Sequence, residues 1–246
     1  MRSFFVLLAL ASLPVALSAA PSPQTFQSGP ARVALVELYT SEGCSSCPPA
    51  DRWLGSLRND PRLWHDFVPI AFHVNYWDRL GWKDRLSSRA YTQREYAYSS
   101  EWRAASVYTP CFVLNGAEWH ADPGALNAAA RSNAGLLSLQ LAADPTPDRC
   151  SVHYTTAAPA QHLTAHVALL GGGISTKVMA GENVGSTLTH EFVVLALAES
   201  TLADSTATLT LPAPSVTGAP RSAVVAWITQ GSSPRPLQSV GGWLVQ

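Results

Sequence analysis

Two cysteines separated by two serines, Cys44-Ser45-Ser46-Cys47, are the residues of this sequence with the most definite chemistry. Such a pair closes into a short disulfide, and in its reduced form the thiolate attacks other disulfides or binds soft metal ions. An inert disulfide and half of a zinc site are the alternative interpretations. The sequence has no second Cys-x-x-Cys pair and no cysteine and histidine at zinc-finger spacing, which argues against a closed zinc site.

A strand pattern precedes the pair and a helix pattern follows it. The apolar segment 33–39 is typical of a buried strand, and apolar residues recur at helical spacing over 53–57. At a helix start the amide N–H groups are unpaired and the helix dipole is positive, so the thiolate of Cys44 is favoured there. Cys47 is then the resolving thiol. Glu42 lies just before the pair, and its charge partly opposes the helix by raising the pKa of the thiol.

A second strand pattern, over 67–74, brings further side chains to the same place. With the helix between them, the two strands form a parallel pair, and functional residues gather at the carboxyl ends of such strands. His73, Tyr76 and Trp77 are therefore expected near the cysteines. His73 either stabilises the thiolate, binds a metal or is a structural histidine. The two aromatic residues either line a substrate groove or belong to the core.

The N-terminus and the composition indicate an exported protein. Residues 1–18 combine a basic start, an apolar run and small residues at the end, and we interpret them as a cleaved signal peptide, with 19–31 as a flexible leader. About 230 residues would remain, with no later segment long enough to span a membrane. The net charge of -1 argues against nucleic acid and anionic membranes as partners, and four cysteines fit a redox pair in an oxidising compartment.

The periodicity changes at 133–136, where we place a domain boundary. Residues 32–133 combine the strand–helix–strand unit with a helical insertion over 87–105 and a hairpin at Asn115-Gly116. Residues 136–246 alternate short strand patterns with Gly, Pro and Asn, which predicts an antiparallel, sandwich-like all-β domain. Its predicted strands are 136–141, 150–154, 163–169, 189–198, 207–211 and 223–229, with a last one near Trp243.

Four stretches of the sequence resemble one family of secreted bacterial proteins. They are 36–51, 72–84, 108–110 and 181–190, which read VELYTSEGCSSCPPAD, FHVNYWDRLGWKD, YTP and GENVGSTLTH. The family is described only as a domain of unknown function, and it resembles the thioredoxin-like superfamily. The resemblance implies an α/β thioredoxin-like domain with a helical insertion, followed by the all-β domain. The sequence departs from the family pattern at Asn75, where an Asp is usual, and at Cys111, where a polar residue is more common.

The same resemblance assigns roles outside the cysteine pair. Thr109-Pro110 matches the position where thioredoxin-like proteins have a cis X-Pro bond, so that Pro110 shapes the site and Thr109 pairs with an extended substrate. A trans proline at the start of an edge strand is the alternative. Glu37 matches an acid buried behind the pair, which would exchange a proton with Cys47. A surface carboxylate is the alternative for Glu37.

The two remaining cysteines allow three interpretations. Cys111 and Cys150 form a disulfide between the two predicted domains, stay separate and buried, or place Cys111 beside the pair as a third ligand for Cu(I). Four further residues could take part in catalysis or metal binding by their type, but no motif surrounds them in the sequence. We interpret these as ordinary surface or turn residues: Asp51, His120, Lys177 and His190.

The leading prediction is therefore an exported thiol–disulfide oxidoreductase. Its catalytic residues are Cys44, Cys47, Pro110 and Glu37, and its substrate-binding residues are Thr109, Tyr76 and Trp77. It needs no cofactor and no metal, and its partners are exported proteins with thiols or disulfides, together with a possible redox partner. The alternatives are a binding module that captures Cu(I) or a protein without turnover, and a structural protein in which the disulfide merely staples a turn.

Overall fold

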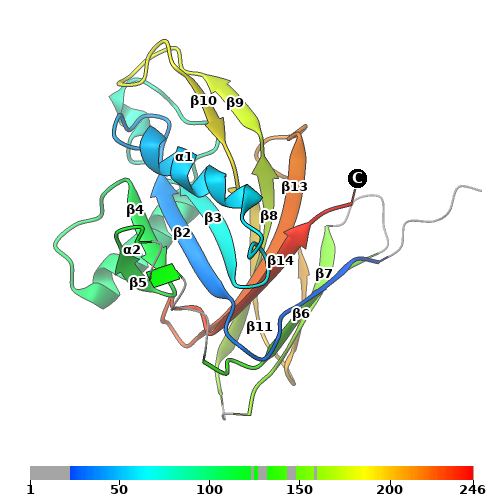
Figure 1. Ribbon diagram of the computed structural model, residues 1–246. Helices are drawn as coiled ribbons and strands as arrows, with labels where there is room; N and C mark the ends of the chain where they lie inside the picture. Colours follow the sequence, from blue (N-terminus) through cyan, green and yellow to red (C-terminus); the bar gives the residue numbers. More distant parts are fainter. Residues whose placement is uncertain (1–22, 123–124, 127–131, 143–147, 158–159, 246) are drawn as a thin grey trace, which may run out of the picture.

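The computed structural model describes residues 23–122, 125–126, 132–142, 148–157 and 160–245 (Figure 1). The signal peptide predicted over 1–18 lies outside these residues. Part of the predicted leader is described, and it contains a short strand, β1 (Thr25–Gln27). None of the described helices is long and apolar enough to cross a membrane.

One mixed sheet of eight strands dominates the described structure, in the order β14-β13-β8-β11-β3-β2-β4-β5. Strands β2 and β3 are parallel and β4 is antiparallel to β2, whereas β8, β11, β13 and β14 form an antiparallel group. The bounds are β2 (Ala34–Thr40), β3 (Phe67–His73), β4 (Cys111–Leu114), β5 (Ala117–Trp119), β8 (Leu163–Gly172), β11 (Val193–Thr201), β13 (Arg221–Gln230) and β14 (Gln238–Trp243).

Two smaller sheets complete the β structure. A four-stranded sheet has the order β1-β6-β7-β12 and packs its apolar side chains against those of β8, β13 and β14, which makes a second core. A separate hairpin joins β9 and β10. The bounds are β6 (Leu136–Leu141), β7 (Arg149–Thr155), β9 (Ile174–Lys177), β10 (Thr187–His190) and β12 (Thr206–Thr210).

Two α-helices cover opposite faces of the β2–β4 part of the large sheet. Trp53 of α1 (Pro48–Ser56) packs edge to face on Phe112, the cross-strand partner of Leu38. Tyr98 of α2 (Arg89–Trp102) packs on Tyr39, which points to the other side because successive strand residues alternate. Ser88 caps α2 by accepting a hydrogen bond from the amide of Ala90. Two single-turn 3-10 helices also occur, η1 (Leu57–Asn59) and η2 (Asp78–Leu80).

The predicted fold class is wrong. Most of the predicted strands are present, but they do not form a thioredoxin-like α/β domain with a helical insertion and a separate antiparallel domain. A short parallel junction, with Val193 of β11 beside Ala71 of β3, joins strands from both sides of 133–136 into one sheet. Accordingly, the largest core contains Val36 and Phe72 together with Val225 and Trp227.

The end of the chain also closes onto its beginning. Gln238 on β14 is buried, and its Oε1 accepts a hydrogen bond from the amide of Val33 at 2.8 Å. Its Nε2 lies within hydrogen-bond distance of the carbonyls of Gly29, Ala31 and Gly135. A periodicity pattern shows where strands begin and end but not which strands pair, and this explains why the continuity of the sheet was missed.

Candidate functional site

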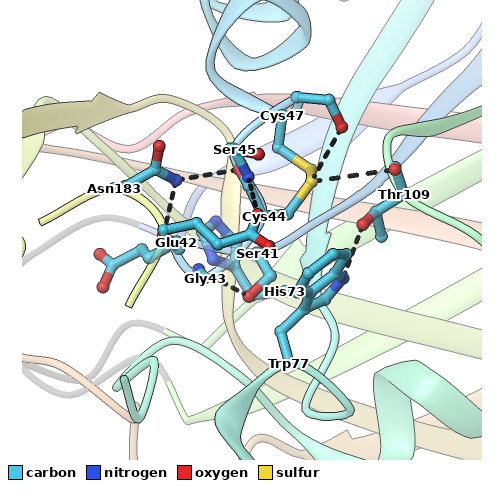
Figure 2. The surroundings of a disulfide bond; sticks show 12 residues. Ser41, Glu42, Gly43, Cys44, Ser45, Cys47, His73, Trp77, Thr109 and Asn183 are labelled. Atoms are coloured by element: carbon cyan, nitrogen blue, oxygen red, sulfur yellow. Dashed lines mark hydrogen bonds between the residues drawn. A yellow bond between two sulfur atoms is a disulfide. The ribbon is translucent and has the colours of Figure 1, made fainter. Parts of the chain in front are cut away.

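A disulfide between Cys44 and Cys47 forms the centre of the candidate site (Figure 2). Their Cα atoms are 5.4 Å apart, and the pair occupies the turn between the carboxyl end of β2 and the start of α1. Cys47 is the N-cap residue of α1, and prolines fill the first two helical positions. Cys44 and Cys47 are both 0% exposed, although the serines between them are exposed.

On one side, the disulfide meets the Thr109–Pro110 turn. The Thr109–Pro110 bond is cis, as predicted, and the carbonyl oxygen of Thr109 lies 3.8 Å from Sγ of Cys44. Nε1 of Trp77 donates a hydrogen bond to Oγ1 of Thr109 at 2.8 Å and so fixes this turn. The structure therefore brings two of the predicted substrate-binding residues, Thr109 and Trp77, against the disulfide.

Tyr76 lies beside Trp77 and lines a cavity of about 600 Å³ that reaches Thr109. The wall of this cavity is largely apolar or aromatic, with Arg79 as its charged side chain. Leu80, Tyr96 and Tyr108, which complete much of the wall, are among the exposed large hydrophobic residues of the described structure.

On the other side, the loop of the β9–β10 hairpin lies against the cysteine turn, as Figure 2 shows for Asn183. The Nδ2 atom of Asn183 donates hydrogen bonds to the carbonyl oxygens of Glu42 and Cys44, both at 2.9 Å. The amide of Ser45 donates to Oε2 of Glu182 at 3.1 Å. We call residues 181–186 the strap. Gly181 has φ of +78° and its Cα faces Trp82, so a larger residue there would be strained.

A cluster of buried ionisable side chains lies directly behind the cysteine turn. Nδ1 of His73 is 2.7 Å from Oδ2 of Asp84, which also accepts a hydrogen bond from the amide of Glu42 at 2.9 Å. Nε2 of His190 is 3.2 Å from Oε1 of Glu42, and the rings of His73 and His190 meet edge to face at 4.9 Å. The fifth member, Asp51, is buried in the first turn of α1. We call these five residues the acid–histidine cluster.

Burial and pairing shift the pKa values of the cluster in different directions. Burial raises the pKa of Asp51, although His190 and His73 act against it. Burial opposes the charged form of His73, but the nearby carboxylates, that of Asp84 foremost, together outweigh burial and raise the pKa of His73. Burial also acts to raise the pKa of Asp84, but His73 and two backbone amides together lower it. Burial acts to raise the pKa of Glu42 too, but hydrogen bonds from His190 and other side chains together lower it.

Glu37 is buried, as its predicted role requires, but other partners occupy its carboxylate. Its carboxylate is buried and forms an ion pair with Arg94, with Nε at 2.7 Å from Oε2 and Nη2 at 3.1 Å from Oε1. The hydroxyls of Tyr98 and Tyr39 donate to the same carboxylate at 2.5 and 3.0 Å. The contacts of Glu37 therefore fix α2 to β2, and they do not include either cysteine of the disulfide.

Cys111 and Cys150 do not form the disulfide that was one of the three interpretations. Both are free and buried, and they belong to different cores, Cys111 to that of the large sheet and Cys150 to that beneath the four-stranded sheet. Burial raises the pKa of Cys111 to about 12 and that of Cys150 to about 11, so both remain protonated thiols at neutral pH. In the described part of the chain, no group of three or more His, Cys, Asp or Glu side chains is arranged to hold a metal ion.

Two functional candidates were interpreted from the sequence as surface or turn residues. Asp51 lies four residues after Cys47, which is one helical turn, and this spacing was a usable signal. His190 is the last residue of the stretch GENVGSTLTH, whose chemistry becomes visible only when β10 is placed beside the cysteine turn. Asn183, in the same stretch, was missed for the same reason.

Comparison with known proteins identifies a family without a known activity. A family model described as "Protein of unknown function (DUF1223)" matches residues 35–229. A crystal structure of a protein from Agrobacterium tumefaciens is similar, with a TM-score of 0.62 and 27% identity over 89% of this chain and 96% of the other. The structure of HBP35 of Porphyromonas gingivalis has a TM-score of 0.58 and 14% identity over 88% of this chain and 76% of the other. No curated protein sequence matches.

Proposed function

This chain belongs to the DUF1223 family of proteins of unknown function, and we propose that it is an exported thiol–disulfide oxidoreductase acting through Cys44 and Cys47. The observation that carries the proposal is a Cys-x-x-Cys disulfide at the N-terminus of a helix, with the Thr109 carbonyl 3.8 Å from Cys44. The partners are exported proteins that contain thiols or disulfides. A disulfide is typical of an oxidising compartment, which agrees with export.

The exchange has two steps. A thiolate of the partner attacks Sγ of Cys44, the Cys44–Cys47 bond breaks, and Cys47 leaves as a thiolate while a mixed disulfide forms at Cys44. A second thiol of the partner then attacks the mixed disulfide and releases Cys44, so that the pair is reduced and the partner is oxidised. Because each step is reversible, the same residues reduce a partner disulfide when the protein starts in its reduced form.

The start of α1 stabilises the thiolate mainly through the helix dipole. Pro48 and Pro49 have no N–H, and the amide of Asp51 donates to the carbonyl of Cys47 within the helix. Fewer amide donors are therefore left to bind a thiolate directly than in a helix without these prolines. We infer that the thiolate of the Cys44–Cys47 pair is stabilised to an intermediate rather than an extreme degree.

Both sulfurs are covered, so exchange requires the strap to move. Two hydrogen bonds from Asn183 and one to Glu182 hold the strap on the cysteine turn. The two hydrogen bonds of Asn183 are neutral and contribute about 1 kcal/mol each, so opening of this loop is accessible at room temperature. We propose that an extended segment of the partner then occupies the cavity of about 600 Å³ beside Tyr76, Trp77 and Thr109.

Disulfide exchange with insulin tests the proposal. Wild-type protein, Cys44→Ser and Cys47→Ser are compared at equal concentration with dithiothreitol as the reductant. We expect wild type to accelerate insulin reduction, Cys44→Ser to be inactive, and Cys47→Ser to accumulate mixed disulfides that are visible by mass spectrometry. Equal rates for wild type and Cys44→Ser would remove the enzyme assignment.

A binding module without turnover is the second candidate, and the complete burial of both sulfurs favours it. In that case the reduced pair captures Cu(I), or the surface recruits a protein, and no partner disulfide is exchanged. Mass spectrometry of the reduced protein with Cu(I) separates the two candidates. One bound Cu(I) per chain that is lost in Cys44→Ser supports binding, whereas trapped mixed disulfides support exchange.

A further inference from the structure

In the proposed exchange, the Cys47 thiolate must gain a proton when the disulfide opens and lose it when the disulfide closes. Glu37 cannot serve, because both of its oxygens are bound by Arg94 and by tyrosine hydroxyls. Apart from the exposed Glu182, the acid–histidine cluster supplies the other carboxyl groups that the described residues place near the cysteine turn. One of its members, Asp51, belongs to the same helix as Cys47.

We propose that Asp51 exchanges this proton with Cys47 and that a small cavity beside His190 connects Asp51 to solvent. The inference rests on the proposed function, since it concerns how the same disulfide opens and closes. It gives the packing of α1 beside β10 a specific task, which is to move one proton to or from a buried sulfur.

The position of Asp51 follows from helix geometry. The amide of Asp51 donates to the carbonyl of Cys47 at 3.1 Å, so the two residues are one turn apart. Side chains four residues apart lie on the same helical face, with Cβ atoms about 6 Å apart. Both side chains are buried, and this spacing therefore places the carboxyl group and the sulfur on the same, inner face of α1.

A cavity of about 140 Å³ lies on the other side of Asp51. Its wall combines the start of α1 with β10, and it consists of Pro48, Asp51, Arg52, Thr187, Leu188, Thr189 and His190. Thr187 and Thr189 are exposed, so the cavity borders on the surface. The volume is enough for a few water molecules, and Asp51, His190 and the threonine hydroxyls offer them hydrogen-bond partners.

The charged groups around Asp51 come from several elements. His190 faces it from β10, His73 from β3 and Asp84 from the segment before α2, while Glu42 lies beyond His190. His190 and His73 favour the carboxylate, whereas Asp84 and burial favour the neutral acid. Burial is the largest effect, and it raises the pKa of Asp51, so the neutral acid is more favoured here than in an exposed Asp.

Opening and closing of the disulfide each move one proton between Asp51 and Cys47. When a partner thiolate attacks Cys44, the electron pair of the Cys44–Cys47 bond moves to Sγ of Cys47. The protonated carboxyl of Asp51 gives its proton to this thiolate and becomes a carboxylate, which regains a proton from water in the cavity. In the reverse direction the Asp51 carboxylate accepts the Cys47 proton, and the Cys47 thiolate attacks the mixed disulfide at Cys44.

The first test is an NMR titration that requires no exchange partner. In wild type, the carboxyl carbon of Asp51 is followed against pH in the oxidised and the reduced protein. Because a titrating thiol replaces the disulfide beside it, we expect the Asp51 curve to change on reduction and to show coupled titration with Cys47. Identical Asp51 curves in the two states would overturn the inference, and the wild-type fold ensures that the result is not one of misfolding.

The second test compares variants. Asp51→Asn keeps the shape of the side chain but cannot accept or give up the carboxyl proton, and Asp204→Asn makes the same change in an exposed turn. We expect Asp51→Asn to slow insulin reduction by roughly a hundredfold and to flatten its pH profile, with Asp204→Asn unchanged. Unchanged rate and profile in Asp51→Asn would refute the role of Asp51 while leaving the oxidoreductase proposal intact. Inactivity of wild type itself would instead refute the proposed function.

Discussion

Two groups of buried charges each include a residue of the large sheet, Glu37 of β2 or His73 of β3, and they differ in how completely their hydrogen-bonding capacity is filled. In the first, Glu37 and Arg94, the carboxylate receives two bonds from the guanidinium and two from tyrosine hydroxyls, and Arg94 also contacts the carbonyl of Pro234. In the second, the acid–histidine cluster, Nε2 of His190 is paired with Oε1 of Glu42, but two buried ring nitrogens have no hydrogen-bond partner among the described residues. These atoms are Nε2 of His73 and Nδ1 of His190.

The difference separates structure from chemistry. A buried ion pair whose bonding capacity is filled holds two elements in a fixed relation, and removing one partner leaves an uncompensated charge. A buried polar group without a hydrogen-bond partner lowers the stability of the fold, so its presence calls for a functional explanation. The acid–histidine cluster lies next to the disulfide and to a cavity that borders on solvent. The Glu37–Arg94 pair instead joins β2 to α2. We therefore expect substitutions in the first group to change stability and substitutions in the second to change reactivity.

Removing the cation of the filled pair should have the largest effect on stability. Arg94→Met leaves the Glu37 carboxylate buried without its partner, and we expect a loss of about 4 kcal/mol in the free energy of unfolding. Urea unfolding measures this loss, and Arg89→Met, at an exposed position of the same helix, is the control. The exchange rate per folded molecule should stay the same, and a reduced rate would contradict the assignment of this pair to structure alone.

The next effect is expected at the His73–Asp84 pair, and it depends on pH. Asp84→Asn removes a charged hydrogen-bond partner of His73, with an expected loss of about 2 kcal/mol. Because the pKa of Asp84 is lowered, its contribution is present above about pH 4 and is lost as the pH falls through the folded value. Because the pKa of His73 is raised, its contribution is present below about pH 6.5 and is lost as the pH rises through the folded value.

Unfolding at several pH values tests this window. The penalty of Asp84→Asn should be greatest between about pH 4 and pH 6.5 and should shrink on both sides. Asp60→Asn breaks a partly exposed pair with Arg62 near the surface and should cost less than about 1 kcal/mol. A penalty for Asp84→Asn that is independent of pH would show that its charge does not couple to His73.

At the strap we expect a substitution to lower stability by a smaller amount and to make the disulfide more reactive. Asn183→Ala removes two hydrogen bonds to the cysteine turn and should make opening easier by about 1–2 kcal/mol. Reduction of the oxidised protein by dithiothreitol should then be about tenfold faster. Val184→Ala alters an exposed residue of the same loop and is the matched control. A rate that does not respond to Asn183→Ala would mean that the strap does not limit access.

The smallest effect is expected at the two free cysteines. Their pKa values of about 12 and about 11 keep Cys111 and Cys150 protonated, so iodoacetamide at pH 8 should leave both unmodified in the native, oxidised protein. Mass spectrometry should show two modified cysteines only after unfolding in denaturant. Rapid native modification of either residue would show that its core is more open than the structure indicates.

The sequence was informative about local structure and much less so about partners in space. The hairpin at Asn115-Gly116 and the helix capped by Ser88 were predictable because each depends on a few adjacent residues. The cis Thr109–Pro110 bond and the position of Cys44-Cys47 came from a motif. The pairing of β3 with β11 depends on residues more than a hundred positions apart, and no local pattern specifies it.

The candidate site shows the same limit. Glu37 was assigned to the disulfide from the resemblance to thioredoxin-like proteins, but strand alternation turns it toward α2 and Arg94. Asp51 was within reach of a sequence argument through its spacing from Cys47. His190 was not, since only the hairpin of β9 and β10 brings it to Glu42.

The parallel junction between β3 and β11 has a consequence for biosynthesis. While the ribosome is still making the second half of the chain, β3 has β2 on one side and nothing to pair with on the other, since Val193 has not yet been added. An unpaired apolar edge invites association with other chains. We therefore expect products that stop near residue 133 to aggregate, and export to depend on factors that keep the nascent chain unfolded until its last strands are complete.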